Sequence, residues 1–107
     1  DSMCAAGMPE GVYELGGQAV YVKDGKALLA DGTIAASTTN IFAEFRNIIS
    51  FGVPVRQAVK SCTINPARAI GVDDVTGSIA VGKRADFTVL SSDLKELECV
   101  YIKGKRI

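Results

Sequence analysis

The 107-residue sequence contains no histidine, and this limits the chemistry that its side chains can perform. Neither a Ser-His-Asp triad nor a Cys-His pair can form, so proton transfer would fall to carboxylates, lysines or tyrosines. Carboxylates alone could hold a hard cation such as calcium or magnesium. The acidic residues are scattered, however, and their one adjacent pair, Asp73-Asp74, is interpreted as a solvated turn. The commonest hydrolytic designs are therefore excluded for this chain taken alone.

The glycines and cysteines do not form a recognisable binding motif. Gly16-Gly17 lacks the lysine of a P-loop and the three-glycine spacing of a dinucleotide site, so it is interpreted as a tight bend. Cys4, Cys62 and Cys99 are odd in number and form no C-x-x-C pair, which favours reduced thiols over disulfides or zinc. Reduced thiols are typical of the cytoplasm, where we expect this protein.

The overall charge argues against two classes of partner. Twelve Lys and Arg balance twelve Asp and Glu, so no net field attracts nucleic acid or an anionic membrane. No apolar run approaches the roughly 20 residues that span a bilayer, and no leader pattern opens the sequence. We expect neither a nucleic-acid nor a membrane partner. The sequence opens on Asp1 rather than methionine, as a processed or truncated product would.

Hydrophobic periodicity predicts strands, then helices, then strands. Asp24-Gly25 and Asp31-Gly32 separate β-prone runs and predict an antiparallel meander over residues 13–34. Apolar residues at helical spacing predict three helices. The first is capped by Ser37, Thr38 or Thr39 and ends at Gly52; the second has Pro54 in its first turn; the third has Asn65 as cap, Pro66 at its first helical position and Gly71 as its end. Period-two alternation then predicts two strands, one within residues 85–93 and one that starts at Leu97 and runs to a Lys103-Gly104 turn.

The stretch "GSIAVGKRAD" is interpreted as structural, because nothing in it offers a nucleophile or an acid to a substrate. Glycines supply turn conformations there. We expect Gly77 and Gly82 in turns, Ile79 packed, Lys83 and Arg84 exposed, and Asp86 either accepting backbone hydrogen bonds or paired with Arg68.

Longer motifs resemble a known family. The stretch "NPARAIGVDDVTGSIAVGKRAD" is similar to the C-terminal end of amidohydrolase-superfamily enzymes, where an N-P-A helix start precedes G-x-I-x-x-G-x-x-A-D. The front of the chain resembles N-acetylglucosamine-6-phosphate deacetylases in its D-[AS]-M-x-A-A-G opening, its Y-x-L-G-G-Q-x-V-Y-V-K-D-G hairpin and its A-D-G-T-[LI]-A-x-S-T turn. This resemblance extends over essentially the whole chain.

The resemblance implies an α/β fold, with the chain supplying the C-terminal part of a (β/α)8 barrel and part of an attached small β-sandwich. Residues 1–71 would form the end of the catalytic barrel, with the last-strand rim, a β-hairpin insertion and closing helices. Residues 72–107 would form C-terminal strands of the sandwich. As a fragment, the chain would show mixed β-hairpins, three helices and C-terminal antiparallel strands.

The resemblance also implies roles for four residues. Asp1, which opens the D-x-M motif, would be the general base for a metal-bound water attacking the acetamide and then the acid for the departing amine. Ile34, Ala35 and Ala36 match a substrate-side loop usually read as L-x-G-S, although Ala36 replaces its glycine. For these three residues, a plain turn leading to a helix cap is an equally weighted alternative.

The implied function is metal-dependent hydrolysis of N-acetylglucosamine 6-phosphate to glucosamine 6-phosphate and acetate, in amino-sugar metabolism. The resemblance implies a divalent metal, zinc or similar, with ligands upstream of Asp1, and a homodimer. We expect this chain alone to bind no catalytic metal and to be inactive, and its uncovered surfaces to self-associate. The alternatives are another amidohydrolase, acting on a cyclic amide or an aminopurine, and a freestanding module that binds partners through open β-edges.

Overall fold

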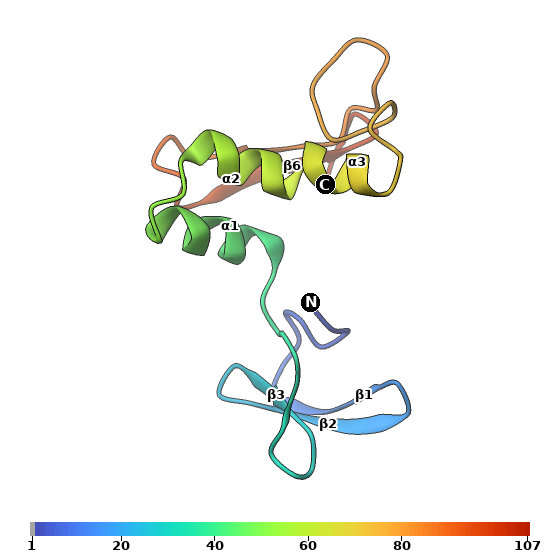
Figure 1. Ribbon diagram of the computed structural model, residues 1–107, viewed down its shortest axis with the longest axis vertical. Helices are drawn as coiled ribbons and strands as arrows, with labels where there is room; N and C mark the ends of the chain where they lie inside the picture. The colour runs from blue at the N-terminus through green and yellow to red at the C-terminus, as the bar shows by residue number, and fades with distance from the viewer. Residues whose placement is uncertain (1) are drawn as a thin grey trace. The chain divides into compact units, whose positions relative to one another are not determined.

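The computed structural model describes residues 2–107, and its contacts divide the chain into two compact units, Asp1–Glu44 and Phe45–Ile107 (Figure 1). Strands dominate the first unit, while the second combines helices with a separate small sheet. The expected division into barrel residues 1–71 and sandwich residues 72–107 concerns a longer polypeptide and stays a prediction.

The first unit is an antiparallel meander of four strands in the order β1-β2-β3-β4. Its hairpins turn where two consecutive residues adopt positive φ, at Gly16-Gly17 (59° and 82°) and at Asp24-Gly25 (49° and 70°). Such turns match the natural twist of paired strands. The predicted meander and the tight bend at Gly16-Gly17 are thus confirmed. The strands are β1 (Gly11–Leu15), β2 (Gln18–Lys23), β3 (Lys26–Leu28) and β4 (Ile34–Ala36).

One face of this meander carries the core of the first unit. Side chains alternate along β2, so Val20 and Val22 are buried while their neighbours are exposed. Ala27 of β3 and two residues of the N-terminal segment, Met3 and Ala5, complete the buried cluster. The segment that begins the chain is therefore held on the sheet by hydrophobic packing.

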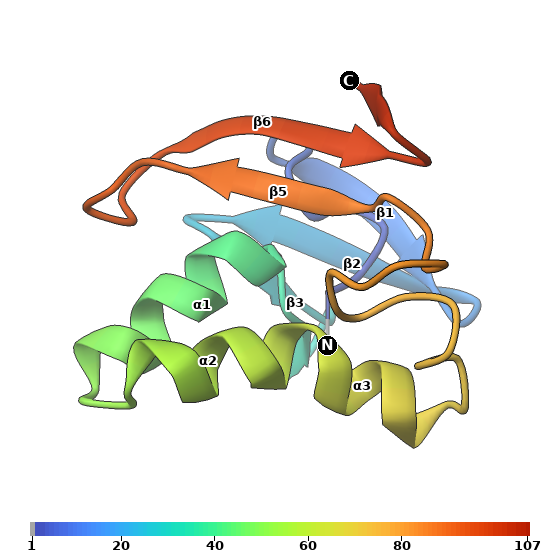
Figure 2. The same ribbon diagram turned by 90° about the horizontal axis from the view of Figure 1, so that it is seen from above.

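Three helices follow, α1 (Ile41–Ser50), α2 (Val55–Cys62) and α3 (Ile64–Ala69) (Figures 1 and 2). Helix α1 contains the boundary between the units, which falls after Glu44. Two of the helices end in the same way. After α1, the N–H of Val53 bonds to the carbonyl of Ile48 at 3.1 Å, and Gly52 has φ 93°. After α3, the N–H of Val72 bonds to the carbonyl of Ala67 at 2.9 Å. These are Schellman ends, which need a left-handed residue, and they confirm the predicted stops at Gly52 and Gly71.

The predicted starts of two helices are wrong by a few residues. The cap of α1 is Asn40, whose Oδ1 accepts the N–H of Ala43 at 2.9 Å, and not Ser37, Thr38 or Thr39. The hydroxyls of those three residues make other hydrogen bonds. Helix α3 begins at Ile64, with Thr63 at the cap position, so Asn65 and Pro66 lie inside its first turn. Proline is tolerated there because the first N–H groups of a helix have no intrahelical partner.

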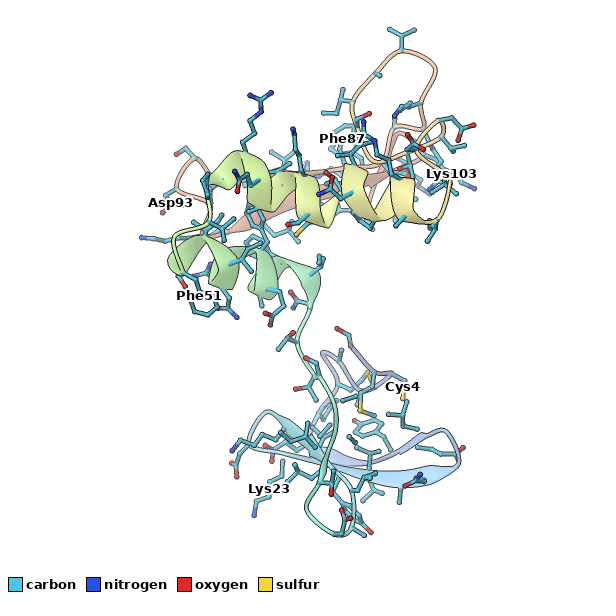
Figure 3. The ribbon with its side chains drawn as sticks, in the orientation of Figure 1. Cys4, Lys23, Phe51, Phe87, Asp93 and Lys103 are labelled. Carbon is cyan, nitrogen blue, oxygen red and sulfur yellow. The ribbon has the colours of Figure 1, made fainter. Side chains whose placement is uncertain are left out.

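The second unit ends in a three-stranded antiparallel sheet of β5 (Phe87–Leu90), β6 (Leu97–Ile102) and β7 (Lys105–Arg106). The turn before β7 has positive φ at Lys103 (51°) and Gly104 (77°), as predicted. Phe87 faces Tyr101 across the β5–β6 pair, and their rings stack with centroids 4.5 Å apart (Figure 3 labels Phe87 and Lys103). Cross-strand aromatic pairs of this kind stabilise a small sheet.

The loop between α3 and β5 differs from its prediction at two residues. Ile79 is 93% exposed rather than packed. Lys83 is half-buried rather than exposed, because its Nζ donates to the Asp73 carbonyl, to the Thr76 carbonyl at 3.5 Å and to Ser78 Oγ at 2.7 Å. A lysine with three donors can close a loop in this way.

Gly77, Gly82 and Arg84 in this loop match the prediction. Both glycines have φ 87°, and Arg84 is exposed. Of the two alternatives for Asp86, backbone acceptance is confirmed, since its Oδ1 accepts the N–H of Lys103 at 2.7 Å. Its ion-pair partner is Arg84 rather than Arg68, which instead lies 3.7 Å from Asp73.

Candidate functional site

The candidate catalytic residue Asp1 lies outside the described residues. The segment that follows it forms a β-bridge and hydrogen bonds with residues after β4. Ser2 pairs with Ser37 in a parallel β-bridge, and the N–H of Met3 donates to the Ser37 carbonyl at 3.0 Å. The hydroxyl of Ser2 donates to the carbonyl of Thr39 at 2.6 Å. Ser2 and Met3 are therefore held by hydrogen bonds next to the C-terminal end of β4.

The candidate substrate segment Ile34–Ala36 is strand β4, so the interpretation of these residues as a turn is wrong. Ala36 lies opposite Ala27 and Ile34 lies opposite Leu28, which leaves Ala35 as an extra residue without a partner in the register. This β-bulge explains why a short strand resembled a turn in sequence. Ile34 is 75% exposed, while Ala35 and Ala36 are half-buried against the core of the unit.

The loop that leads into β4 is closed by its own polar groups. The N–H of Thr33 donates to Asp31 Oδ1 at 2.9 Å, and the N–H of Leu29 donates to the Thr33 carbonyl at 2.8 Å. The backbone N–H and then the hydroxyl of Thr33 hold the pKa of Asp31 below its ordinary value. Asp31 is thus a structural acceptor that stays ionised, and it is a poor candidate for proton transfer.

Two hydroxyl contacts fix the chain after β4. Thr38 Oγ1 donates to the carbonyl of Gly25 at 2.8 Å, which ties this segment to the β2–β3 hairpin. Ser37 Oγ accepts the N–H of Thr39 and donates to Thr39 Oγ1, both at 3.1 Å. An open hollow of about 370 Å³ lies here, lined by Ser2, Ser37, Thr39, Asn40, Ile41 and Glu44. Sequence reasoning missed Ser2, Ser37 and Thr39 as a group, because nothing in their spacing showed that residues 2 and 37 pair.

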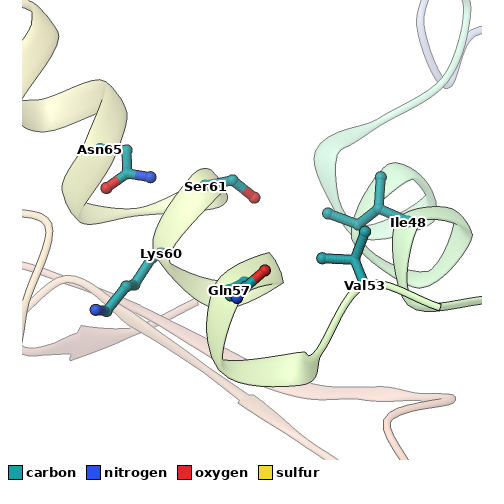
Figure 4. Close-up of a pocket in the computed structure, with 6 residues that line it drawn as sticks. All are labelled: Ile48, Val53, Gln57, Lys60, Ser61 and Asn65. Atoms are coloured by element: carbon teal, nitrogen blue, oxygen red, sulfur yellow. The ribbon is translucent and has the colours of Figure 1, made fainter. Parts of the chain in front are cut away.

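A second hollow, of about 490 Å³, lies in the other unit and is less suited to catalysis. Ile48 and Val53 form one side of it, opposite Gln57 and Ser61 of α2 (Figure 4). The amine of Lys60 points away from Ile48 and Val53 (Figure 4), and the hydroxyl of Ser61 donates to the Ala58 carbonyl at 2.8 Å. No carboxylate or thiol lines this hollow. Among these lining residues the Ser61 hydroxyl is already engaged and no carboxylate accompanies Lys60, so the hollow holds no pair of groups arranged for proton transfer.

The described residues do not fit a metal centre. Within residues 2–107, no three His, Cys, Asp or Glu side chains come together as a ligand set. The cysteines are free: Cys4 is exposed (labelled in Figure 3), and Cys62 and Cys99 are half-buried. In the same part of the chain, no helix is long and apolar enough to span a membrane.

Comparison with known proteins identifies the class to which these elements belong. Residues 14–107 match the model of the amidohydrolase family. The chain therefore belongs to the amidohydrolase family.

Several of its relatives within that family are sugar-phosphate deacetylases. The chain is 40% identical over 106 residues to the N-acetylgalactosamine-6-phosphate deacetylase of Escherichia coli O157:H7, covering 98% of this chain and 28% of that protein. It superposes on the crystal structure of N-acetylglucosamine-6-phosphate deacetylase from Pasteurella multocida with a TM-score of 0.90 and 31% identity, over 100% of this chain and 28% of that one.

A third relative was solved with a bound sugar phosphate. It is a mutant of the N-acetyl-D-glucosamine-6-phosphate deacetylase from Mycobacterium smegmatis in complex with N-acetyl-D-glucosamine-6-phosphate. It has a TM-score of 0.82 and 37% identity, over 98% of this chain and 28% of that one. The present chain thus spans less than a third of the length of each of these three proteins.

Proposed function

We propose that this chain is the C-terminal portion of a metal-dependent deacetylase that hydrolyses N-acetylglucosamine 6-phosphate to glucosamine 6-phosphate and acetate. The observation that carries the proposal is the superposition of the whole chain on solved deacetylases, with both the strand-rich unit and the helical unit included. A freestanding β-edge module has no comparable support, because the likeness is not confined to the strands.

The proposed catalytic residue is Asp1. Its carboxylate would take a proton from the water that attacks the acetyl carbonyl, and would return that proton to the nitrogen as the carbon–nitrogen bond breaks. One carboxylate suits both steps because the same proton is carried from the nucleophile to the leaving group. The β-bridge between Ser2 and Ser37 supports this proposal, since it joins the segment that follows Asp1 to the residue that follows β4, the strand proposed to face the substrate.

The proposed substrate contacts are made by Ile34, Ala35 and Ala36. A β-bulge leaves peptide groups outside the ladder, and bulges are over-represented beside active sites. The extra residue in β4, Ala35, therefore offers backbone polar groups to an acetamide, which carries one carbonyl and one N–H. The exposed Ile34 side chain could pack against the methyl group of the substrate.

The divalent metal implied by the sequence resemblance finds no ligand set among residues 2–107. We therefore assign its ligands to the part of the polypeptide outside this chain, and we route no step through the metal. The free cysteines support a cytoplasmic enzyme, since thiols remain reduced there. A homodimer remains part of the proposal.

The epimeric substrate N-acetylgalactosamine 6-phosphate is a second candidate. It is favoured by the 40% identity to a deacetylase named for that sugar. The two substrates differ in the orientation of a single hydroxyl group, and none of the proposed roles in this chain involves that hydroxyl.

The deciding experiment measures acetate release by the native polypeptide that carries this sequence, with each sugar phosphate as substrate. We expect hydrolysis of N-acetylglucosamine 6-phosphate with the higher kcat/KM, and no turnover by the isolated 107-residue chain. A higher kcat/KM for the galactosamine epimer would establish the second candidate. Absence of deacetylation of both would refute the proposal.

A further inference from the structure

Two Asp-Gly pairs in the first unit share the same reactive sequence. In such a pair the glycine nitrogen can attack the side-chain carboxyl carbon of the aspartate, because glycine has no side chain to shield that nitrogen. Asp24-Gly25 forms the β2–β3 turn, and Asp31-Gly32 lies in the loop that leads into β4. All four residues are exposed, and the space around both glycines is open. Exposure and crowding therefore do not distinguish the two pairs.

Hydrogen bonds engage both reacting groups of Asp31-Gly32. The N–H of Gly32 donates to the carbonyl of Leu29 at 3.0 Å, and Asp31 Oδ1 accepts the N–H of Thr33 at 2.9 Å. The backbone N–H and then the hydroxyl of Thr33 keep the pKa of Asp31 below its ordinary value. This carboxyl group stays ionised, and a carboxylate is a weaker electrophile than the neutral acid.

The hydrogen bonds of Asp24-Gly25 involve other atoms. The N–H of Asp24 donates to Glu10 Oε1 at 2.6 Å, and the carbonyl of Gly25 accepts the hydroxyl of Thr38 at 2.8 Å. Among residues 2–107, neither the Gly25 N–H nor the Asp24 carboxylate makes a hydrogen bond, and that carboxylate is in no ion pair. The two groups that would react with each other are thus unengaged.

We propose that Asp24 is a site of spontaneous isomerisation to isoaspartate, and that the hydrogen bonds of Asp31-Gly32 suppress the same reaction there. The Gly25 nitrogen forms a bond to Cγ of the neutral Asp24 carboxyl group and loses its proton, and the carboxyl hydroxyl leaves with that proton as water. Water then opens the succinimide ring at one of its two carbonyl carbons. Opening at Cγ restores aspartate, whereas opening at the former main-chain carbonyl gives isoaspartate with no net change of atoms.

The product would alter the hairpin, because isoaspartate adds the Cβ atom to the main chain. Lys23 and Lys26 face each other across a turn of only two residues, and the length of such a loop sets the strand register. The carbonyl of Gly25, which holds Thr38, belongs to the same turn. Asp24 would therefore limit the lifetime of the β2–β3 pairing. This inference does not rest on the proposed function.

The test ages the native polypeptide at neutral pH, both folded and in urea. Samples are digested with an endoproteinase that cleaves before aspartate but not before isoaspartate. Intact sites release the peptide of residues 24–30. Isomerisation of Asp24 leaves this peptide joined to the preceding residues, and isomerisation of Asp31 leaves it joined to the following residues, so mass spectrometry measures each site separately.

A matched pair of variants separates the nitrogen from the carboxyl group. Asp24→Asn and Asp31→Asn both present a neutral side-chain amide, which cyclises with loss of ammonia instead of water, so ionisation no longer differs between the sites. The folded Asp24→Asn variant should still deamidate faster, because only the Gly32 N–H is engaged. The mass difference between amide and acid reports this reaction.

In the folded wild type we expect Asp24 to isomerise at least about five times faster than Asp31, the factor that corresponds to one net hydrogen bond. In urea the two rates should be similar. Equal rates in the folded protein, or the same ratio in urea, would overturn the inference, as would an unreacted Asp24 in the folded protein while the urea sample reacts. The digest does not measure deacetylation, so this failure is distinguishable from failure of the proposed function.

Discussion

Different interactions stabilise the interior of each of the two units. The strand-rich unit has a contiguous buried cluster of five residues, centred on the fully buried Val20. In the longer helical unit, the described buried hydrophobic residues are Phe45, Ala58 and Ala67. Local hydrogen bonds add to them: those of the glycine-terminated helix ends, those that Lys83 donates to three acceptors, and the one that Asp86 accepts. The first unit can therefore fix a site by packing, whereas the second depends on many small backbone constraints.

The largest expected effect is on kcat, and it tests whether the first unit carries the chemistry while the second only supports the fold. Asp1→Asn in the native polypeptide should lower kcat by at least about 100-fold, because an amide cannot accept and return the proton. The thermal midpoint should stay the same. The matched variant in the second unit is Lys83→Met, which removes the loop contacts and should lower the midpoint while leaving kcat unchanged. A fall of kcat in Lys83→Met with normal stability would break this division of roles.

A glycine pair tests how strongly the second unit depends on backbone constraints. Gly77 and Gly82 both have φ 87°, but a Cβ at Gly77 would lie 2.7 Å from the Ala67 Cβ, whereas a Cβ at Gly82 meets nothing within 4 Å. We expect Gly77→Ala to lower the free energy of unfolding by about 3 kcal/mol, through strain and a clash with α3. Gly82→Ala should cost about 1 kcal/mol through strain alone. Equal losses in denaturant titrations would contradict the close packing of Gly77.

A valine pair tests the core of the first unit. Val20 is fully buried and Val12 is 64% exposed, although both lie on neighbouring strands. Val20→Ala should cost about 2 kcal/mol of unfolding free energy, through lost burial and a residual cavity. Val12→Ala should cost less than about 0.5 kcal/mol. If Val12→Ala proves equally costly in the native polypeptide, the rest of that polypeptide must cover this face of the sheet.

The smallest expected effect is a pH dependence centred on Asp86. The N–H of Lys103, followed by Arg84, lowers the pKa of Asp86 below its ordinary value of 3.8. A lowered pKa in the folded state means that the ionised form stabilises the fold above about pH 3.8, and that this contribution is lost as the pH falls through the lowered pKa. Asp86→Asn should therefore be less stable than wild type at pH 7, and the deficit should shrink as the pH falls below about 3.8 and through the lowered pKa. A deficit that is independent of pH would assign the loss to geometry rather than to charge.

Much of the fold follows from local signals in the sequence. Asp24-Gly25, Gly52 and Gly71 mark turns and helix ends because the backbone conformation required there is available to few residues. Asn40 could also have been identified as a cap, since asparagine is among the best N-cap residues and directly precedes the first periodic residue, Ile41.

The remaining errors arise where tertiary contacts decide. Lys83 reads as a surface charge in sequence, and only the folded loop brings three acceptors to its amine. Ile34–Ala36 reads as a turn because a bulged strand lacks regular alternation. The bridge between Ser2 and Ser37 joins distant positions, and local patterns carry no information about such pairs.

The unpaired residue of β4, Ala35, allows the length of this segment to change without disrupting the pairing of the sheet. Because Ala35 has no partner, the ladder formed by Ala36 with Ala27 and by Ile34 with Leu28 would close into a regular register if Ala35 were deleted. In a regular strand, by contrast, a one-residue slip inverts every side chain. Evolution can therefore lengthen or shorten the chain here by one position and reshape the surface around Ile34, while the hydrogen-bond ladder of the meander persists.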